Sequence, residues 1–335
     1  MPFDNLSGIK TKKYNLGLFI LLTFLALVGT MIIPVLGLLG AALLPIPTSL
    51  LIIGGRVRSG VICTVISCLV IFFFSYILSP VMMFVIITTA FVHRDAIEKK
   101  LPAWKTISTV FLVFAGAVLL YLLLYVIFFG VGSIKEISSN YNSYIDGMAD
   151  DPIFLVYTEL LMIEVPELDA VISQTQALLR FLPKIIPGIL AVSFALISTT
   201  NYLISSNVYK RNQIEIRSVR SFMTWDFPWY YVWGIIVGLV LILIPEMGSS
   251  VDGSSAFIDT TIDVLGFNLV IIFGALYTVL GISVLWGIFI RFKLALVVRI
   301  IITAFLLFFF GIALIVVPLI GLIDIWVNFR KLKRD

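Results

Sequence analysis

The apolar residues of this chain fall into long blocks that short polar connectors separate. A helix needs about 20 apolar residues to cross the hydrocarbon of a bilayer, and in lipid its backbone must satisfy its own hydrogen bonds. The alternation typical of membrane β-strands is not seen. The pattern therefore predicts an all-α integral membrane protein, a polytopic helical bundle of about 8–10 membrane segments. The blocks cover residues 16–53, 61–92, 107–130, 185–204, 229–245, 265–290 and 294–326.

Two of these blocks are interrupted and predict more than one helix each. Block 16–53 is too long for one ordinary crossing, and Pro34 with two following glycines breaks its middle. We expect two closely spaced helices there. Block 61–92 is interrupted at Ser79 and Pro80, and its short second half predicts a tilted or partial crossing.

The last block, residues 294–326, permits two arrangements. Gly311 and Pro318 allow two short helices, whereas an uninterrupted block would form one long helix. The basic tail that follows prefers the cytoplasm, so an even number of crossings, and hence a two-helix hairpin, is favoured. A single crossing would place the tail outside.

The largest polar segment, residues 131–183, is acidic, and Lys135 and Arg180 are its only basic residues. Between residues 167 and 182 the apolar positions recur on one helical stripe, and Pro166 suits a first turn. This pattern predicts an amphipathic helix on the bilayer surface or over the mouth of a cavity. The acids of the segment are Glu136, Asp146, Asp150, Asp151, Glu159, Glu164, Glu167 and Asp169.

Charge orients the predicted helices. Most of the 23 Lys and Arg residues lie in connectors that a single threading scheme puts on one side, and such an excess marks cytoplasmic loops. We therefore expect both termini in the cytoplasm and a multi-pass protein of the inner (cytoplasmic) membrane. The chain would form one membrane domain with N-terminal helices in 1–130, an acidic extracytoplasmic segment in 131–183, and C-terminal helices in 184–335.

Composition agrees with the pattern. Of the residues, 61% are hydrophobic and 13% charged, whereas soluble domains carry about 25% charged residues. The net charge of +4 comes from short basic clusters beside apolar blocks, so we expect the lipid bilayer, and no nucleic acid, as a partner. Cys63 and Cys68 lie five positions apart, which is no redox or metal spacing. They are expected to be small core residues.

The sequence carries no catalytic, cofactor or metal signature. The only histidine, His93, sits beside Arg94 at a membrane edge and is expected to be a solvated side chain. Without further histidines or a thiolate cluster, zinc or iron binding is not expected. No GxxxxGK[ST], GxSxG or HExxH motif occurs. We therefore expect no enzyme, no cofactor and no metal.

Polar residues inside apolar blocks are the remaining candidates for a site, because burying them without a partner costs free energy. They could line a ligand cavity, or they could form interhelical hydrogen bonds and interfacial anchors. Arg299 and Asp324 could form a structural ion pair if the last two helices are antiparallel neighbours. The cavity candidates are Tyr121, Tyr125, Asn201, Tyr202, Asn268 and Tyr277.

Four segments resemble the YybS-like family of bacterial polytopic membrane proteins, a domain of unknown function. They are residues 44–47, 222–229, 268–282 and 321–331, and the resemblance extends over nearly the whole chain. It implies a fold similar to the substrate-binding membrane subunits of energy-coupling-factor transporters, and a bacterial inner membrane. Those subunits bind a small molecule near the outer surface under an outer loop, and segment 131–183 would suit such a lid.

Two functions follow from these expectations. The first is a component that binds or transports a small-molecule ligand in a cavity between the spans. The second is a scaffold or regulator without transport activity, whose acidic outer segment or basic cytoplasmic faces recruit a membrane protein partner or anionic lipid. Polar residues that converge in a hydrated cavity would favour the first function, and a packed interior would favour the second.

Overall fold

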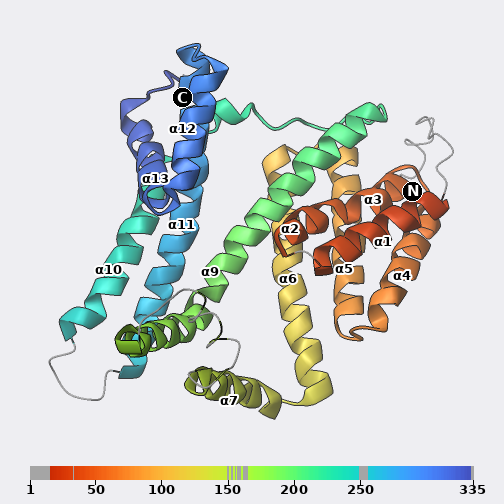
Figure 1. The fold of residues 1–335 in the computed structure, drawn as a ribbon. Helices are drawn as coiled ribbons and strands as arrows, with labels where there is room; N and C mark the ends of the chain where they lie inside the picture. Colours follow the sequence, from red (N-terminus) through yellow and green to blue (C-terminus); the bar gives the residue numbers. More distant parts are fainter. Residues whose placement is uncertain are drawn as a thin grey trace. The chain divides into compact units, whose positions relative to one another are not determined.

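The computed structural model of the chain describes residues 16–32, 34–148, 165–248 and 256–332, together with 151, 154, 156 and 160. The described residues form helices, turns and irregular segments and no β-strand, which confirms the predicted all-α class (Figure 1). Residues 1–15, several acids of segment 131–183, and the last three residues lie outside the described residues. The α-helices are α1 Leu16–Ile32, α2 Pro34–Leu43, α3 Pro45–Ile53, α4 Val57–Phe72, α5 Leu78–Glu98, α6 Ala103–Phe129, α7 Gly132–Asp146, α9 Val165–Arg211, α10 Val232–Gly248, α11 Ala256–Arg291, α12 Leu296–Phe308 and α13 Phe310–Val327.

Several of these helices are suited to a membrane. Five segments are long and apolar enough to cross one by length and composition, and shorter apolar helices accompany them. This confirms a polytopic helical membrane protein, while the number of crossings and the side on which each terminus lies stay predictions. The five segments are Leu78–Glu98, Ala103–Phe129, Leu168–Arg211, Thr261–Arg291 and Phe310–Val327.

The chain divides into two compact units. Unit 1 comprises Met1–Tyr144 with Ser193–Val219, and unit 2 comprises Ile145–Val192 with Arg220–Asp335. The division falls within α9, so this one helix contributes residues to both units.

The N-terminal block forms three helices, not the predicted two. The extra break lies at Leu44, between the end of α2 at Leu43 and the start of α3 at Pro45, because a proline has no N–H to continue a helix. The short helix α3 is buried at each of its 9 residues. It packs against α1, α4 and α5, so it forms the centre of unit 1.

The second block breaks earlier than predicted. Helix α4 ends at Phe72, and α5 begins at Leu78, so Pro80 lies in the first turn of α5. Helix α5 then continues to Glu98, through residues that the charge pattern placed in a connector. The segment is therefore a 21-residue helix of spanning length and not a short one.

Helix α9 joins two elements that the sequence predicted separately. The amphipathic segment 167–182 and the apolar block that follows it form one helix of 47 residues with Pro183 and Pro187 inside. Interior prolines remove helix hydrogen bonds and kink the axis. Figure 1 shows the first part of α9 strongly bent away from the longer part.

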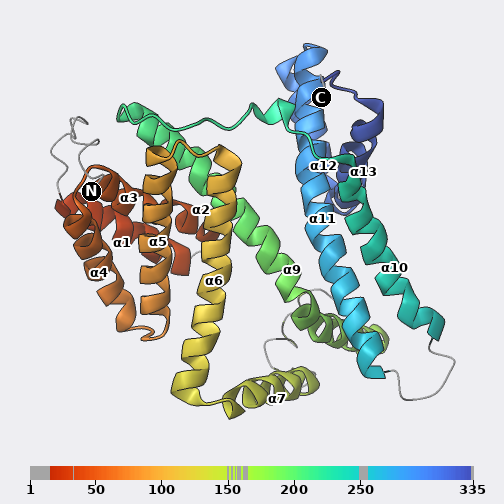
Figure 2. The same ribbon diagram turned by 180° about the vertical axis from the view of Figure 1, so that it is seen from behind.

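Unit 2 is built on close contacts between α10, α11 and α13. Helix α10 packs along α11, and α11 packs along α13 (Figure 2). A side chain at Gly281 of α11 would collide with the backbone of Val317 in α13, and one at Gly321 would collide with the backbone of Tyr277. Glycines at these positions therefore allow the two backbones to touch.

The last block forms the two helices that were favoured, α12 and α13. Their junction is Phe309, two residues before Gly311, and Pro318 is accommodated inside α13. Whether the pair crosses the membrane once or twice stays a prediction.

Candidate functional site

Buried polar side chains gather in unit 1 around His93. This histidine lies on α5 and is fully buried, so the prediction of a solvated side chain was wrong. Helix α5 continues past it, and its spacing from Ile86, Thr89 and Ala90 puts it on the buried face of that helix. That spacing was the signal that the sequence reasoning missed.

His93 is held by aromatic residues of α9. Its Nδ1 lies 2.6 Å from the hydroxyl oxygen of Tyr209. Its ring stands edge-on to Tyr209 and Tyr202, with centroids 5.7 Å and 6.4 Å away. The amide of Asn201 lies beside the imidazole, and the hydroxyl of Ser205 lies beside that of Tyr209.

The helical repeat explains why these residues meet. Asn201, Ser205 and Tyr209 follow one another at intervals of four on α9, which puts them on one face. Thr89 and His93 have the same spacing on α5. We call these five residues the polar centre.

Several atoms of the polar centre have no hydrogen-bond partner within the part of the chain that the structure describes. They are Thr89 Oγ1, His93 Nε2, Asn201 Oδ1 and Ser205 Oγ, each on a buried residue. The Asn201 amide still interacts with the His93 imidazole, and the Ser205 hydroxyl with that of Tyr209, without the geometry of a full hydrogen bond. Thr106 Oγ1 in unit 1 and Tyr277 Oη in unit 2 share this property. Leaving a buried polar group unsatisfied costs about 1–3 kcal/mol. Such a concentration therefore indicates a place where water, an ion or a ligand completes the hydrogen bonds.

Asn201 also has a structural role at the break between α2 and α3. Its Nδ2 donates to the carbonyl oxygen of Ala42 at 2.7 Å. Carbonyls in the last turn of a helix have no intrahelical donor, and Ala42 is the last residue but one of α2. The amide of Asn201 thus caps α2 in a fully buried position, while its Oδ1 stays available to the polar centre.

Asn268 has a corresponding role in unit 2. Its Nδ2 donates to the carbonyl oxygen of Lys184 at 2.8 Å, and its Oδ1 accepts from the backbone N–H of Gly188. In a regular α-helix these two backbone groups would bond to each other. The side chain of Asn268 therefore inserts into the backbone ladder of α9 beside Pro187. A Cβ at Gly188 would come within 2.8 Å of Asn268 Oδ1, so only glycine admits this contact.

The predicted cavity residues fall into both units. Tyr121 and Tyr125 stack on α6 with centroids 6.3 Å apart, and Tyr121 lines an apolar pocket of about 240 Å³. The hydroxyl of Tyr202 donates to the carbonyl oxygen of Arg217 at 2.5 Å. Asn268 and Tyr277 lie on α11 in unit 2. A single cavity lined by all six residues stays a prediction, whereas Asn201 and Tyr202 are brought together with His93.

The predicted ion pair of Asp324 was wrong in its partner. Asp324 is paired with Arg330, whose Nε and Nη2 lie 3.0 Å and 2.8 Å from Asp324 Oδ2. Arg299 instead donates from Nε to the carbonyl oxygen of Leu294 at 2.9 Å. The cause is local, because α13 ends in a left-handed residue, Asn328, which turns the chain back.

Arg330 is a buried anchor for the segment that follows α13. Its side chain is only 2% exposed. Its Nη1 donates to the carbonyl oxygens of Met223 and Trp225 at 2.9 Å and 2.7 Å, and to Ser283 Oγ at 3.0 Å. These partners join the connector before α10 to α11 and α13. Sequence reasoning treated Arg330 as part of a basic tail that prefers the cytoplasm and so missed this role.

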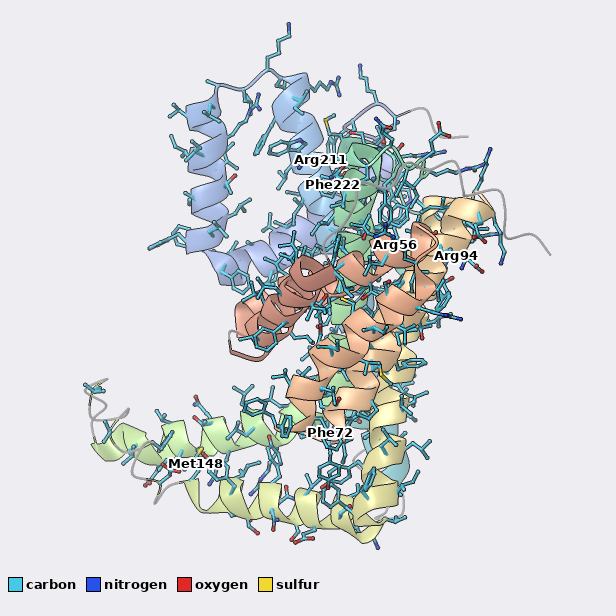
Figure 3. All side chains as sticks on the ribbon, turned by 90° about the vertical axis from the view of Figure 1, so that its right-hand side faces the viewer. Arg56, Phe72, Arg94, Met148, Arg211 and Phe222 are labelled. Atoms are coloured by element: carbon cyan, nitrogen blue, oxygen red, sulfur yellow. The ribbon has the colours of Figure 1, made fainter. Side chains whose placement is uncertain are left out.

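One end of unit 1 carries a second feature, an open pocket of about 790 Å³. It lies between the C-terminal ends of α5 and α9, one helical turn beyond His93 and Tyr209. Figure 3 shows Arg94 and Arg211 at this end, with Arg56, and Phe72 at the opposite end. We call it the basic pocket after its lining cations Lys100, Lys210 and Arg217.

The fold and these contacts define the class of the protein. Long apolar helices broken by prolines, whose freed backbone groups are satisfied by side chains of neighbouring helices, are typical of polytopic helical membrane proteins. A family model described as a predicted membrane protein (DUF2232) matches residues 20–325, and the chain belongs to that family. The predicted membership of an uncharacterised membrane protein family is thus confirmed. No curated protein and no solved structure matches the chain.

Proposed function

We propose that the protein is a small-molecule binding component of the membrane, and that the polar centre binds a small polar solute between α5 and α9. The observation that supports this proposal is the group of partnerless polar atoms around His93. Both helices contain segments of spanning length, and polar groups at such positions are by default candidates for a solute or ion pathway. A role in transport is the natural extension of such a site.

The available groups define the solute. Asn201 Oδ1 accepts only, the hydroxyls of Thr89 and Ser205 donate or accept, and His93 Nε2 does one or the other according to its tautomer. No carboxylate belongs to the polar centre, and none of its members carries a fixed charge. The fitting ligand is therefore a small, hydrogen-bonding solute and not a strongly charged one.

The second candidate function is a scaffold or regulator that holds partners without transporting a solute. The amide contacts of Asn201 and Asn268 favour it, because each amide satisfies backbone groups at a break or kink in a helix. Both contacts are interhelical hydrogen bonds, which the sequence left open as the alternative to lining a cavity. The scaffold function accounts for those amides, but it does not account for the partnerless hydroxyls.

Replacing Thr89 by valine separates the two candidates. Valine removes a buried hydroxyl that has no partner, so we expect the ligand-free protein to become more stable by about 1 kcal/mol. The same change should abolish the thermal stabilisation by any solute that stabilises the wild type. Native mass spectrometry of the wild type should show a retained small molecule that Thr89→Val has lost.

Thr64→Val is the matched control in the same unit. Thr64 is also buried, but its hydroxyl is 2.9 Å from that of Thr48 and bonds to the carbonyl oxygen of Gly60. We expect this variant to be less stable and to bind the solute as the wild type does. Two results together would refute the proposal. The wild type retains no solute, and no polar metabolite raises the melting temperature of the wild type more than it raises that of Thr89→Val.

A further inference from the structure

The basic pocket has the size and the lining of a site for an amphipathic anion. Its volume of about 790 Å³ lies in the range of roughly 300–1,000 Å³ that small-molecule sites occupy. Ile97, Ile214 and Ile216 supply apolar wall, while Lys100, Lys210 and Arg217 supply positive charge. Glu215 is the one acid among the lining residues.

The charge of the pocket is not neutralised by neighbouring acids. Nearby cations at the C-terminal end of α5 are paired, since Arg94 contacts Glu98 and Lys99 contacts Asp95, both at 2.6 Å. The hydrogen bond that Lys99 donates to the carboxylate of Asp95 raises the pKa of Lys99 above its usual value. By contrast, none of the three lining cations forms an ion pair with a residue that the structure describes. Glu215 and two helix C-termini, which carry about half a negative charge each, offset part of the three positive charges, and the pocket keeps a net charge of about +1.

The wall of the pocket after α9 is held in place by backbone contacts. Gln213 adopts a left-handed conformation with φ of 61°, and the N–H of Ile214 bonds to the carbonyl oxygen of Tyr209 at 2.9 Å. Ile214 is buried in the same hydrophobic cluster as Tyr209. The hydroxyl of Tyr202 fixes the backbone at Arg217. The backbone of this wall is therefore held in place, while the side chains of Lys100, Lys210 and Arg217 are exposed and free to reach a ligand.

The pocket lies where the spanning segments of α5 and α9 end. Trp104, at the start of α6 on the same side as the end of α5, is 65% exposed, with Lys105 Nζ 5.6 Å from its ring centroid. Exposed tryptophans beside basic residues mark the level of the lipid headgroups. The distribution of Lys and Arg predicts that this end faces the cytoplasm, where the leaflet is anionic.

We infer that the basic pocket binds a phosphate group carried at the membrane surface, as the headgroup of an anionic phospholipid. Lys100, Lys210 and Arg217 contact the phosphate oxygens, and the three isoleucines contact the first carbons of the lipid. The shared chemistry is phosphate recognition by unpaired cations, so a soluble phosphate compound is the other source of the ligand. This site stands apart from the polar centre and does not depend on the proposed function.

The test compares full-length protein in nanodiscs that contain phosphatidylglycerol or only phosphatidylcholine, with lipid retention read by native mass spectrometry. The pocket variant carries Lys100→Gln, Lys210→Gln and Arg217→Gln. One basic residue near a membrane surface contributes roughly a fivefold factor in affinity, so we expect phosphatidylglycerol to bind roughly a hundredfold more weakly to this variant.

The control variant carries Arg56→Gln, Arg58→Gln and Lys105→Gln. It removes the same charge from exposed positions on the same expected side of unit 1, outside the pocket. At 0.15 M salt the screening length is about 8 Å, so the control should retain phosphatidylglycerol nearly as the wild type does. Equal loss in both variants, or no preference of the wild type for the anionic lipid, would overturn a lipid site.

A second measurement identifies the source of the phosphate. Inorganic phosphate is titrated into wild-type protein in a neutral detergent, and its effect on the melting temperature is compared with that on the pocket variant. Saturable stabilisation of the wild type alone, without phosphatidylglycerol preference, assigns the pocket to a soluble phosphate compound. Retention of phosphatidylglycerol without such stabilisation assigns it to the lipid. If neither anion distinguishes the wild type from the pocket variant, the inference is refuted.

Discussion

Replacing Asn268 by leucine tests the contact between α11 and the kinked part of α9. Leucine has nearly the same size but cannot donate to Lys184 or accept from Gly188, so two interhelical hydrogen bonds are lost. Interhelical hydrogen bonds in membrane proteins average about 0.6 kcal/mol and reach about 1.7 kcal/mol. We therefore expect the free energy of unfolding to fall by about 1–3 kcal/mol.

The measurement is equilibrium unfolding of the full chain in mixed micelles with increasing sodium dodecyl sulfate. The matched control is Thr278→Val, which removes a hydroxyl bond to the carbonyl oxygen of Gly274 in the same helix and should change the free energy by less than about 0.5 kcal/mol. If Asn268→Leu is as stable as Thr278→Val, the side chain does not stabilise the kink and the reasoning is refuted.

A second variant tests whether the loss of stability comes from the direct contact between Asn268 and Gly188. Alanine at Gly188 would bring its Cβ within 2.8 Å of Asn268 Oδ1, so this substitution should destabilise the wild type. In an Asn268→Ala background that oxygen is gone, and the same substitution should cost less. Additive effects of Gly188→Ala and Asn268→Ala would contradict the direct contact.

Three further outcomes follow from the described contacts. Arg330→Met removes the buried ion pair with Asp324 and should cost about 3–5 kcal/mol of unfolding free energy, whereas adding Asp324→Leu should restore much of it. A double variant no more stable than the single one would contradict this. Gly281→Ala should separate α11 from α13 and lower the melting temperature, while Gly274→Ala, which has open space around it, should not; equal shifts would count against the close backbone contact. Both native cysteines are buried and free, so a permeant maleimide should label them slowly until detergent unfolds the protein, and fast labelling of the native protein would show that unit 1 opens.

The sequence was sufficient for the class of fold because lipid imposes it on apolar blocks of this length. It was less informative about where helices end. The break before Pro45 and the continuation of α5 through His93 both depend on the packing of unit 1. Charge alone placed His93 in a connector, whereas the spacing of the apolar residues before it already indicated a buried face.

The candidate site was predicted in its residue types and not in its partners. Asn201 and Asn268 were identified because amides are rare in apolar spans, but their backbone partners at Ala42, Lys184 and Gly188 lie far away along the chain. Such pairings are tertiary and leave no local pattern. Asp324 was identified because a carboxylate is rare in an apolar block, and its true partner lies only six positions later. That pairing depends on the turn at Asn328. Asparagine tolerates a left-handed backbone, so this residue was a local signal that the helix ends and the chain turns back there.

The burial of α3 has a consequence for how the protein is made. Its 9 residues extend roughly 14 Å at 1.5 Å per residue, about half of the hydrocarbon thickness, so this helix cannot cross the bilayer alone. The hydrophobic cluster that covers it includes Tyr209 and Ile214, which the ribosome adds long after α3 has emerged. The hydrophobic cluster around α3 therefore stays incomplete until the end of α9 has been synthesised. The order of synthesis thus makes the completion of unit 1 a late event in biogenesis.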